Sequence, residues 1–133
     1  MPSLKGLTCT IELANSNEPL QEYGTIYNDG FVETFVAVPS KPRPFIVHLK
    51  STQFISPGLA MYVFIDGVYQ CNRNRQNLKH HEPLNTYRSL VDFRVRQKEE
   101  KQHDGTWIAR DWTFEKLNIG KYYEIDCSYA AKI

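Results

Sequence analysis

The chain has 133 residues, of which 41% are hydrophobic and 23% are charged, so it fits a single globular domain over residues 1–133 and excludes disorder as the default. Sixteen basic and fifteen acidic residues give a net charge of +1, which excludes an overall electrostatic attraction to nucleic acid or to membranes. No stretch approaches about 18 consecutive apolar residues and the N-terminus has no apolar signal core, so a cytoplasmic or nuclear protein is expected.

Alternation of apolar and polar residues predicts short strands along the whole chain, separated by turns rich in Gly, Pro, Asn and Asp. The predicted strands cover residues 7–13, 31–38, 45–50, 59–65, 68–69, 89–96, 107–114 and 123–129. Between them lie the connection 39–44, whose three prolines cannot donate to a ladder, and the charged loop 98–105. Residues 115–118 are expected to form one helical turn, and no longer helix is predicted.

These strands predict an all-β fold, most simply a single antiparallel β-sandwich of about eight strands. Jelly-roll and immunoglobulin-like topologies are both compatible with the pattern, so the topology is undecided. The first strand is expected to be half-buried, with Thr8, Thr10 and Glu12 on the face opposite its apolar residues.

One hairpin is predicted by local chemistry alone. Asp66-Gly67 separates two apolar runs, and a type I′ turn needs a positive φ at both of its central residues. The segment that follows, residues 71–83, has little to bury, so it is predicted to be a mobile connection with at most a partner-contacting role.

Three short motifs carry a resemblance that spans roughly residues 5–118. They are Pro19-Leu20-Gln21-Glu22-Tyr23, then Tyr62-Val63-Phe64-Ile65-Asp66-Gly67, and finally a set formed by Trp107, Trp112, Phe114 and Leu117. The sequence resembles an uncharacterised domain family of filamentous fungi with Pro-Leu-x-Glu-Tyr and aromatic-Val-aromatic-x-Asp-Gly motifs. Residues 71–85 depart from the shared pattern. The resemblance implies a common fold and a fungal origin, and it supplies no catalytic residue.

Metal binding and catalysis both lack a supporting pattern. His80 and His81 are adjacent, so on an extended chain they point to opposite sides, and neither Cys71 nor His103 completes a paired ligand spacing. Cysteines 9, 71 and 127 form an odd set without a CxxC spacing, which predicts reduced thiols in an intracellular compartment. No nucleophile motif such as G-x-S-x-G is present, and His48 is expected to be a surface or groove-lining residue. The sequence therefore predicts no enzyme, no metal and no cofactor.

Nucleic-acid binding is the alternative function. Residues 73–110 hold nine Lys or Arg against five Asp or Glu, and the candidate contacts are Arg73, Arg75, Arg88, Arg94 and Arg96. Asp92 interrupts this basic stretch and the domain is close to neutral. Only weak binding of single strands to a β-barrel is therefore predicted.

The primary prediction is a non-catalytic protein–protein interaction module. Residues 31–38 and 59–65 are apolar on both faces, as expected for strands that are covered by another chain or that form a binding surface. The candidate partner-binding residues are Tyr62, Phe64, Phe35 and Tyr69. The partner is expected to be another protein chain or a second copy of this one.

Overall fold

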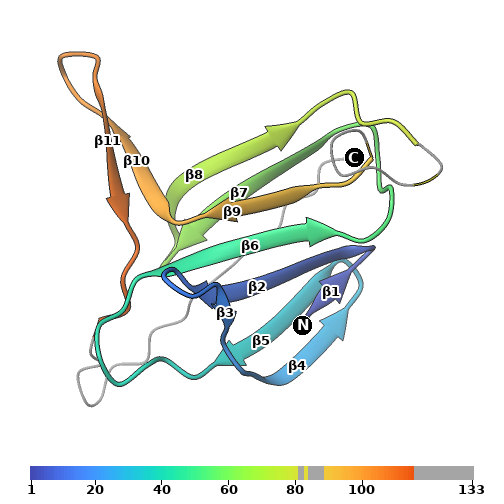
Figure 1. Cartoon of the computed structure of the whole chain (residues 1–133), viewed down its shortest axis with the longest axis horizontal. Helices are drawn as coiled ribbons and strands as arrows, with labels where there is room; N and C mark the ends of the chain where they lie inside the picture. The colour runs from blue at the N-terminus through green and yellow to red at the C-terminus, as the bar shows by residue number, and fades with distance from the viewer. Residues whose placement is uncertain (81–82, 84–88, 116–133) are drawn as a thin grey trace.

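The computed structural model describes residues 1–80, 83 and 89–115 (Figure 1). Within these ranges every regular element is a strand, and all pairings are antiparallel, which confirms the all-β prediction. The strands are β1 (Ser3–Leu4), β2 (Leu7–Leu13), β3 (Glu18–Pro19), β4 (Glu22–Asn28), β5 (Phe31–Val36), β6 (Phe45–Ser51), β7 (Leu59–Ile65), β8 (Val68–Arg75), β9 (Asp92–Val95), β10 (Gln97–Lys101) and β11 (Trp107–Asp111). The same residues contain no helix of the length and apolarity needed to span a membrane. The predictions for residues 116–118 and 123–129 lie outside the described part.

The strands form one five-stranded sheet and three two-stranded hairpins. The sheet has the order β1-β2-β6-β9, and β3 also pairs with β2. Its register places Cys9 opposite Leu49 and Leu49 opposite Phe93, so the alternate apolar residues of three strands share one face. The hairpins are β4–β5, β7–β8 and β10–β11, and the last of these projects from the body (Figure 1).

The hydrophobic core lies on that apolar face. Strands β7 and β8 supply Met61, Val63 and Cys71 to the same buried cluster as Val47 and Val95 of the sheet. The cluster is completed by Cys9, Phe45, Leu49, Trp112 and Phe114. The core therefore joins the β7–β8 hairpin to the sheet, although the two share no ladder among the described residues.

An aromatic stack closes one end of the core. The Phe45 ring lies between its neighbours, with centroid distances of 5.9 Å to Trp112 and 4.3 Å to Phe114. The Trp112 indole N–H donates to the Oε1 atom of Gln70 over 3.1 Å, so the polar edge of this buried ring is satisfied. Residues 112–114 thus extend past β11 and fasten that part of the chain to β6 and β8.

The hairpin predicted at Asp66-Gly67 is confirmed. Ile65 pairs with Val68, and the two turn residues have φ values of 52° and 74°. Positive φ at both positions is the geometry of a type I′ turn, which matches the twist of the flanking strands.

Replacing Gly67 with alanine is expected to lower the free energy of unfolding by about 1–2 kcal/mol, because an L side chain is strained in the left-handed region. No atom lies within 4 Å of the Cβ that would be added, so the cost comes from the backbone alone. Gly58→Ala is the control, since its new Cβ would lie 3.5 Å from the Arg75 carbonyl oxygen, an ordinary contact. Urea denaturation measures both variants, and equal stabilities would contradict the turn geometry.

Residues 71–83 are not a connection throughout, and here the sequence-based prediction is wrong. Strand β8 continues to Arg75, and Cys71 is buried with only 2% of its surface exposed. The polar residues that follow Cys71 remain in the strand because they pair with residues of β7. Arg73 also forms a 2.8 Å ion pair with Glu99, which stabilises this part of β8. Farther along, Leu78 is also buried, and its backbone N–H donates to the Pro57 carbonyl.

The charged segment 98–105 is also misassigned, because its first four residues belong to β10. The β10–β11 ladder brings opposite charges together, with Glu100 accepting from Lys98 at 3.0 Å and from Arg110 at 3.3 Å. The hydrogen bond from Lys98 holds the pKa of Glu100 below its ordinary value. At the hairpin tip, hydrogen bonds from Thr106 likewise lower the pKa of Asp104. The two-stranded β10–β11 arm is thus stabilised by charge pairs between its side chains rather than by a buried apolar face.

Candidate functional site

The aromatic residues of the β7–β8 hairpin gather on its outer face. Tyr62 and Tyr69 are 43% and 44% exposed, whereas Met61 and Val63 of the same hairpin face the core. The rings of Phe64 and Tyr69 meet edge to face with centroids 5.7 Å apart. The Asn72 side-chain amide donates to the Tyr69 hydroxyl. Three of the four predicted partner-binding residues therefore share one small patch.

The fourth predicted residue, Phe35, lies on a different hairpin. In the view of Figure 1, the β4–β5 hairpin lies next to β1 and β2, whereas the β7–β8 hairpin lies on the other side of β6. Phe35 therefore does not join the Tyr62 patch. The register instead pairs Phe35 with Tyr23, and Ile26 with Glu33 on the same face. Cross-strand partners and alternate residues share a face in an antiparallel pair. We call this surface the β4–β5 face; its apolar members are Tyr23, Ile26, Phe31 and Phe35.

The β4–β5 face is the most exposed apolar surface on a strand pair. Each of its four apolar side chains is half or more exposed: Tyr23 by 56%, Ile26 by 50%, Phe31 by 50% and Phe35 by 59%. Sequence reasoning missed Tyr23, Ile26 and the whole of β4, because Gly24 interrupts the alternation there. The register shifts between Tyr23 and Ile26, and Gly24 has a φ of 60° in this irregularity.

The opposite face of the same hairpin is partly covered. Val32, Thr34 and Val36 are half-buried, and the Thr25 and Thr34 hydroxyls are hydrogen-bonded over 2.9 Å. One face of the hairpin is therefore half-buried along β5, although Tyr27 on that face is 56% exposed, and the other face exposes Tyr23, Ile26, Phe31 and Phe35. Large exposed apolar groups on one face are typical of an interaction surface.

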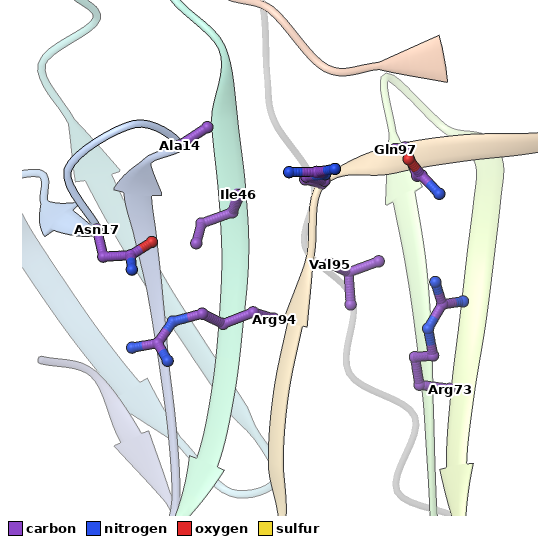
Figure 2. Close-up of a pocket in the computed structure, with 8 residues that line it drawn as sticks. Ala14, Asn17, Ile46, Arg73, Arg94, Val95 and Gln97 are labelled. Carbon is purple, nitrogen blue, oxygen red and sulfur yellow. The ribbon is translucent and has the colours of Figure 1, made fainter. Parts of the chain in front are cut away.

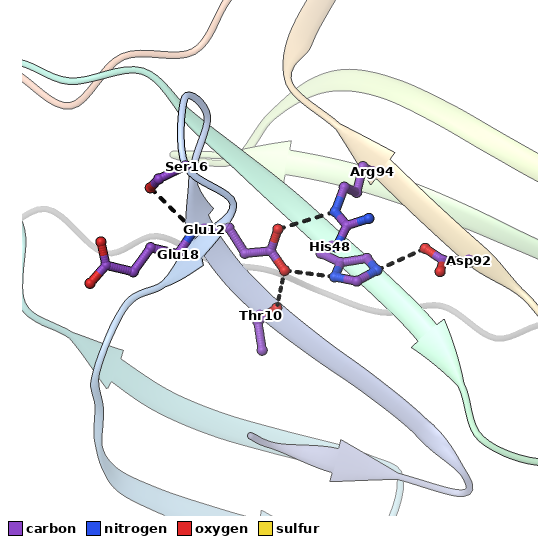
Figure 3. A network of polar contacts seen from close by, with 7 residues as sticks. All are labelled: Thr10, Glu12, Ser16, Glu18, His48, Asp92 and Arg94. Atoms are coloured by element: carbon purple, nitrogen blue, oxygen red, sulfur yellow. Dashed lines mark hydrogen bonds and ion pairs between the residues drawn. The ribbon is translucent and has the colours of Figure 1, made fainter.

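A network of charged side chains lies on the other face of the five-stranded sheet. His48 contacts two carboxylates, with Nδ1 2.7 Å from Glu12 and Nε2 2.7 Å from Asp92 (Figure 3). Arg94 donates from Nε to the second Glu12 oxygen over 3.2 Å, and the Thr10 hydroxyl donates to the first over 3.4 Å. The network joins three strands: β2 supplies Thr10 and Glu12, β9 supplies Asp92 and Arg94, and β6 supplies His48.

This network corrects two predictions. His48 is 5% exposed and not a surface residue, and Thr8, Thr10 and Glu12 are buried as well. The first strand is therefore buried on both faces. The described contacts of His48 are with Glu12 of β2 and Asp92 of β9, so this ring links β6 to the strands on both sides of it.

Three of the five candidate arginines line one cavity of about 330 Å³: Arg73 from β8, Arg94 from β9 and Arg96 just after it. Arg75, at the end of β8, is not part of that lining, and Arg88 lies outside the described residues. The sequence places all five candidates within one basic stretch, residues 73–110. The structure brings Arg73 to β9 from a separate hairpin.

The residues considered for metal binding do not converge within the described ranges. No group of three or more His, Cys, Asp or Glu side chains suited to a metal ion is found there. Cys71 is in the core, where burial raises the pKa of its thiol, and His80 contacts the Phe54 ring edge to face at 5.5 Å. His81 lies outside the described residues.

Comparison of the chain with protein-family models, curated proteins and solved structures finds no match.

Proposed function

We propose that this chain is a non-catalytic protein-binding domain, and that the β4–β5 face is its main contact surface. The observation that carries the proposal is the exposure of four neighbouring apolar side chains, each half or more exposed, on one face of a two-stranded sheet. Aromatic anchors of this kind supply most of the binding energy in protein interfaces.

The backbone of this hairpin supports the same proposal. Among the described strands, neither β4 nor β5 pairs with any strand other than its neighbour. A free strand edge offers N–H and C=O groups to an added strand, while an adjacent apolar face supplies side-chain contacts. A second copy of the chain is the first partner to test, because an apolar face can be self-complementary across a two-fold axis. We further infer that the five-stranded sheet and the β7–β8 hairpin form one sandwich, since a single core cluster joins them.

Binding of single-stranded nucleic acid is the weaker candidate. The described lining of the cavity that contains Arg73, Arg94 and Arg96 has no aromatic ring on which a base could stack.

Sedimentation velocity of the purified chain across a wide concentration range tests self-association. Replacing Phe35 with serine is expected to weaken the association constant by about thirtyfold, because a central aromatic anchor contributes about 2 kcal/mol to an interface. The expected loss comes from the side chain alone, since Phe35 is 59% exposed and contributes little to the core.

Trp107→Ser is the matched control, since Trp107 is an aromatic residue with 67% exposure on the projecting β10–β11 arm. Association should survive this change. Loss of association in Trp107→Ser but not in Phe35→Ser would assign the interface to the arm and contradict the proposal. If the wild-type chain stays monomeric at every concentration, a second copy is excluded as the partner.

A further inference from the structure

The cavity is lined by residues from the β2–β3 turn, β6, β8, β9 and the start of β10, and the charged residues of this lining are all basic. Among the described residues it is lined by Ala14, Asn17, Ile46, Arg73, Arg94, Val95, Arg96 and Gln97, none of which is acidic. Figure 2 shows Arg94 extending toward Asn17, while Arg73 extends toward Gln97. The volume of about 330 Å³ lies at the lower end of the range for small-molecule sites.

Two of the three arginines keep terminal nitrogens that the described contacts do not use, whereas Arg73 already donates from Nη2 to Glu99 and from Nη1 to the Asn72 carbonyl. Arg94 contacts Glu12 through Nε, so the described ion pair does not use its two terminal nitrogens. Arg96 is the most loosely paired of the three, because its Nε lies 3.9 Å from Asp111, beyond hydrogen-bonding distance. Its side chain is 65% exposed, compared with 46% for Arg94 and 34% for Arg73. An anion in the cavity would therefore meet donors that are already positioned on β9 and directly after it.

We propose that this cavity binds the phosphate group of a small phosphate monoester. Such a group carries a charge of about −1.5 to −2 and three strong acceptor oxygens, which suits the unused terminal nitrogens of Arg94 and Arg96. The side-chain amides of Asn17 and Gln97 add neutral donors at the wall. A carboxylate offers one charge and two oxygens and so matches the lining less well. This site is separate from the β4–β5 face and does not depend on the proposed protein binding.

The shape and chemistry of the lining favour a small molecule over a nucleic-acid strand. Apart from the three arginines and the two amides, the described lining consists of the aliphatic residues Ala14, Ile46 and Val95. Aliphatic side chains cannot stack with bases as aromatic rings do. A strand would also need a continuous basic track along its backbone. In this region acids stand beside the arginines outside the cavity, as Glu99 does beside Arg73.

Isothermal titration calorimetry at constant ionic strength tests the site, with glycerol 2-phosphate as the probe and succinate as the carboxylate comparison. Arg96→Gln is expected to weaken binding of the phosphate ester by about tenfold or more, because a hydrogen bond to a charged group is lost. Arg110→Gln is the matched control: its side chain is 67% exposed and pairs with Glu100 outside the cavity lining. That variant should bind within about twofold of the wild type.

A second measurement uses the wild-type protein and depends on no variant. Adding glycerol 2-phosphate should shift the side-chain amide NMR signals of Asn17 and Gln97 before those of other amides. No binding by the wild type, an equal loss in Arg96→Gln and Arg110→Gln, or shifts confined to other regions would each overturn the proposal. Tighter binding of succinate, or of a single-stranded oligonucleotide in an Arg96-dependent manner, would also overturn it.

Discussion

Replacing Glu12 with alanine is expected to lower the free energy of unfolding by about 1–3 kcal/mol, the cost of leaving a buried polar group without its hydrogen-bond partner. Glu12 is 5% exposed and accepts from both His48 and Arg94. Without this carboxylate the buried His48 ring loses one of its two anionic neighbours. The three strands that it joins would also lose their common polar contact. Chemical denaturation followed by circular dichroism measures the change.

Glu18→Ala is the control for this prediction, because Glu18 is an exposed glutamate on the neighbouring strand β3 (Figure 3). Its replacement should change stability by no more than about 0.5 kcal/mol. Similar effects of the two substitutions would show that the Glu12 network does not stabilise the sheet.

The second large effect concerns the two tryptophans, which lie in opposite environments. Trp112→Ala is expected to cost about 3–5 kcal/mol, the usual range for removing a large aromatic side chain from a core. The substitution would remove the stack on Phe45 and leave the buried Gln70 side chain without its indole donor. Trp107 is 67% exposed, so Trp107→Ala should change stability by about 0.5 kcal/mol or less.

Fluorescence provides an independent readout of the same pair. With Trp107 removed, the remaining emission comes from the buried Trp112 and should shift to longer wavelength on unfolding. With Trp112 removed, emission from the exposed Trp107 should change little in position. If the emission shifted on unfolding in the variant without Trp112 and did not shift in the variant without Trp107, the burial of Trp112 would be contradicted.

Sequence reasoning was most successful where the determining interactions are local. Asp66-Gly67 defines its own turn, and the strand over residues 59–65 was predicted with the bounds that the structure has. The strand at 45–50 was also predicted, since alternation of side chains requires no knowledge of the partner strand.

The prediction failed where distant residues determine the outcome. The β10 segment Gln97–Lys101 resembles a loop because its partners for pairing, including Arg110, lie across the hairpin. Thr10 and Glu12 have the appearance of an exposed polar face until β6 and β9 bring His48 and Arg94 beside them. Alternation identifies such a face but gives no indication of whether charges on other strands complement it.

The candidate sites also combine features that the local sequence predicts with features that depend on distant strands. The exposed aromatic character of Phe35, Tyr62 and Tyr69 could be inferred from strands that are apolar on both faces. Their separation onto two hairpins could not, because it depends on the order of strands in space. The meeting of Arg73 with Arg94 likewise follows from the contact between separate strand pairs, which no local pattern encodes.

Site-specific photocrosslinking in the cells that naturally produce this chain would test whether the β4–β5 face binds a protein. A photoreactive phenylalanine analogue is placed at Phe35 in one protein and at Trp107 in another, two aromatic positions that are each more than half exposed. Position 35 should give one discrete covalent product with another polypeptide, at twice the mass of the chain if the partner is a second copy. Position 107 should give no such product. A discrete product from position 107, or none from position 35, would contradict the assignment of protein binding to the β4–β5 face.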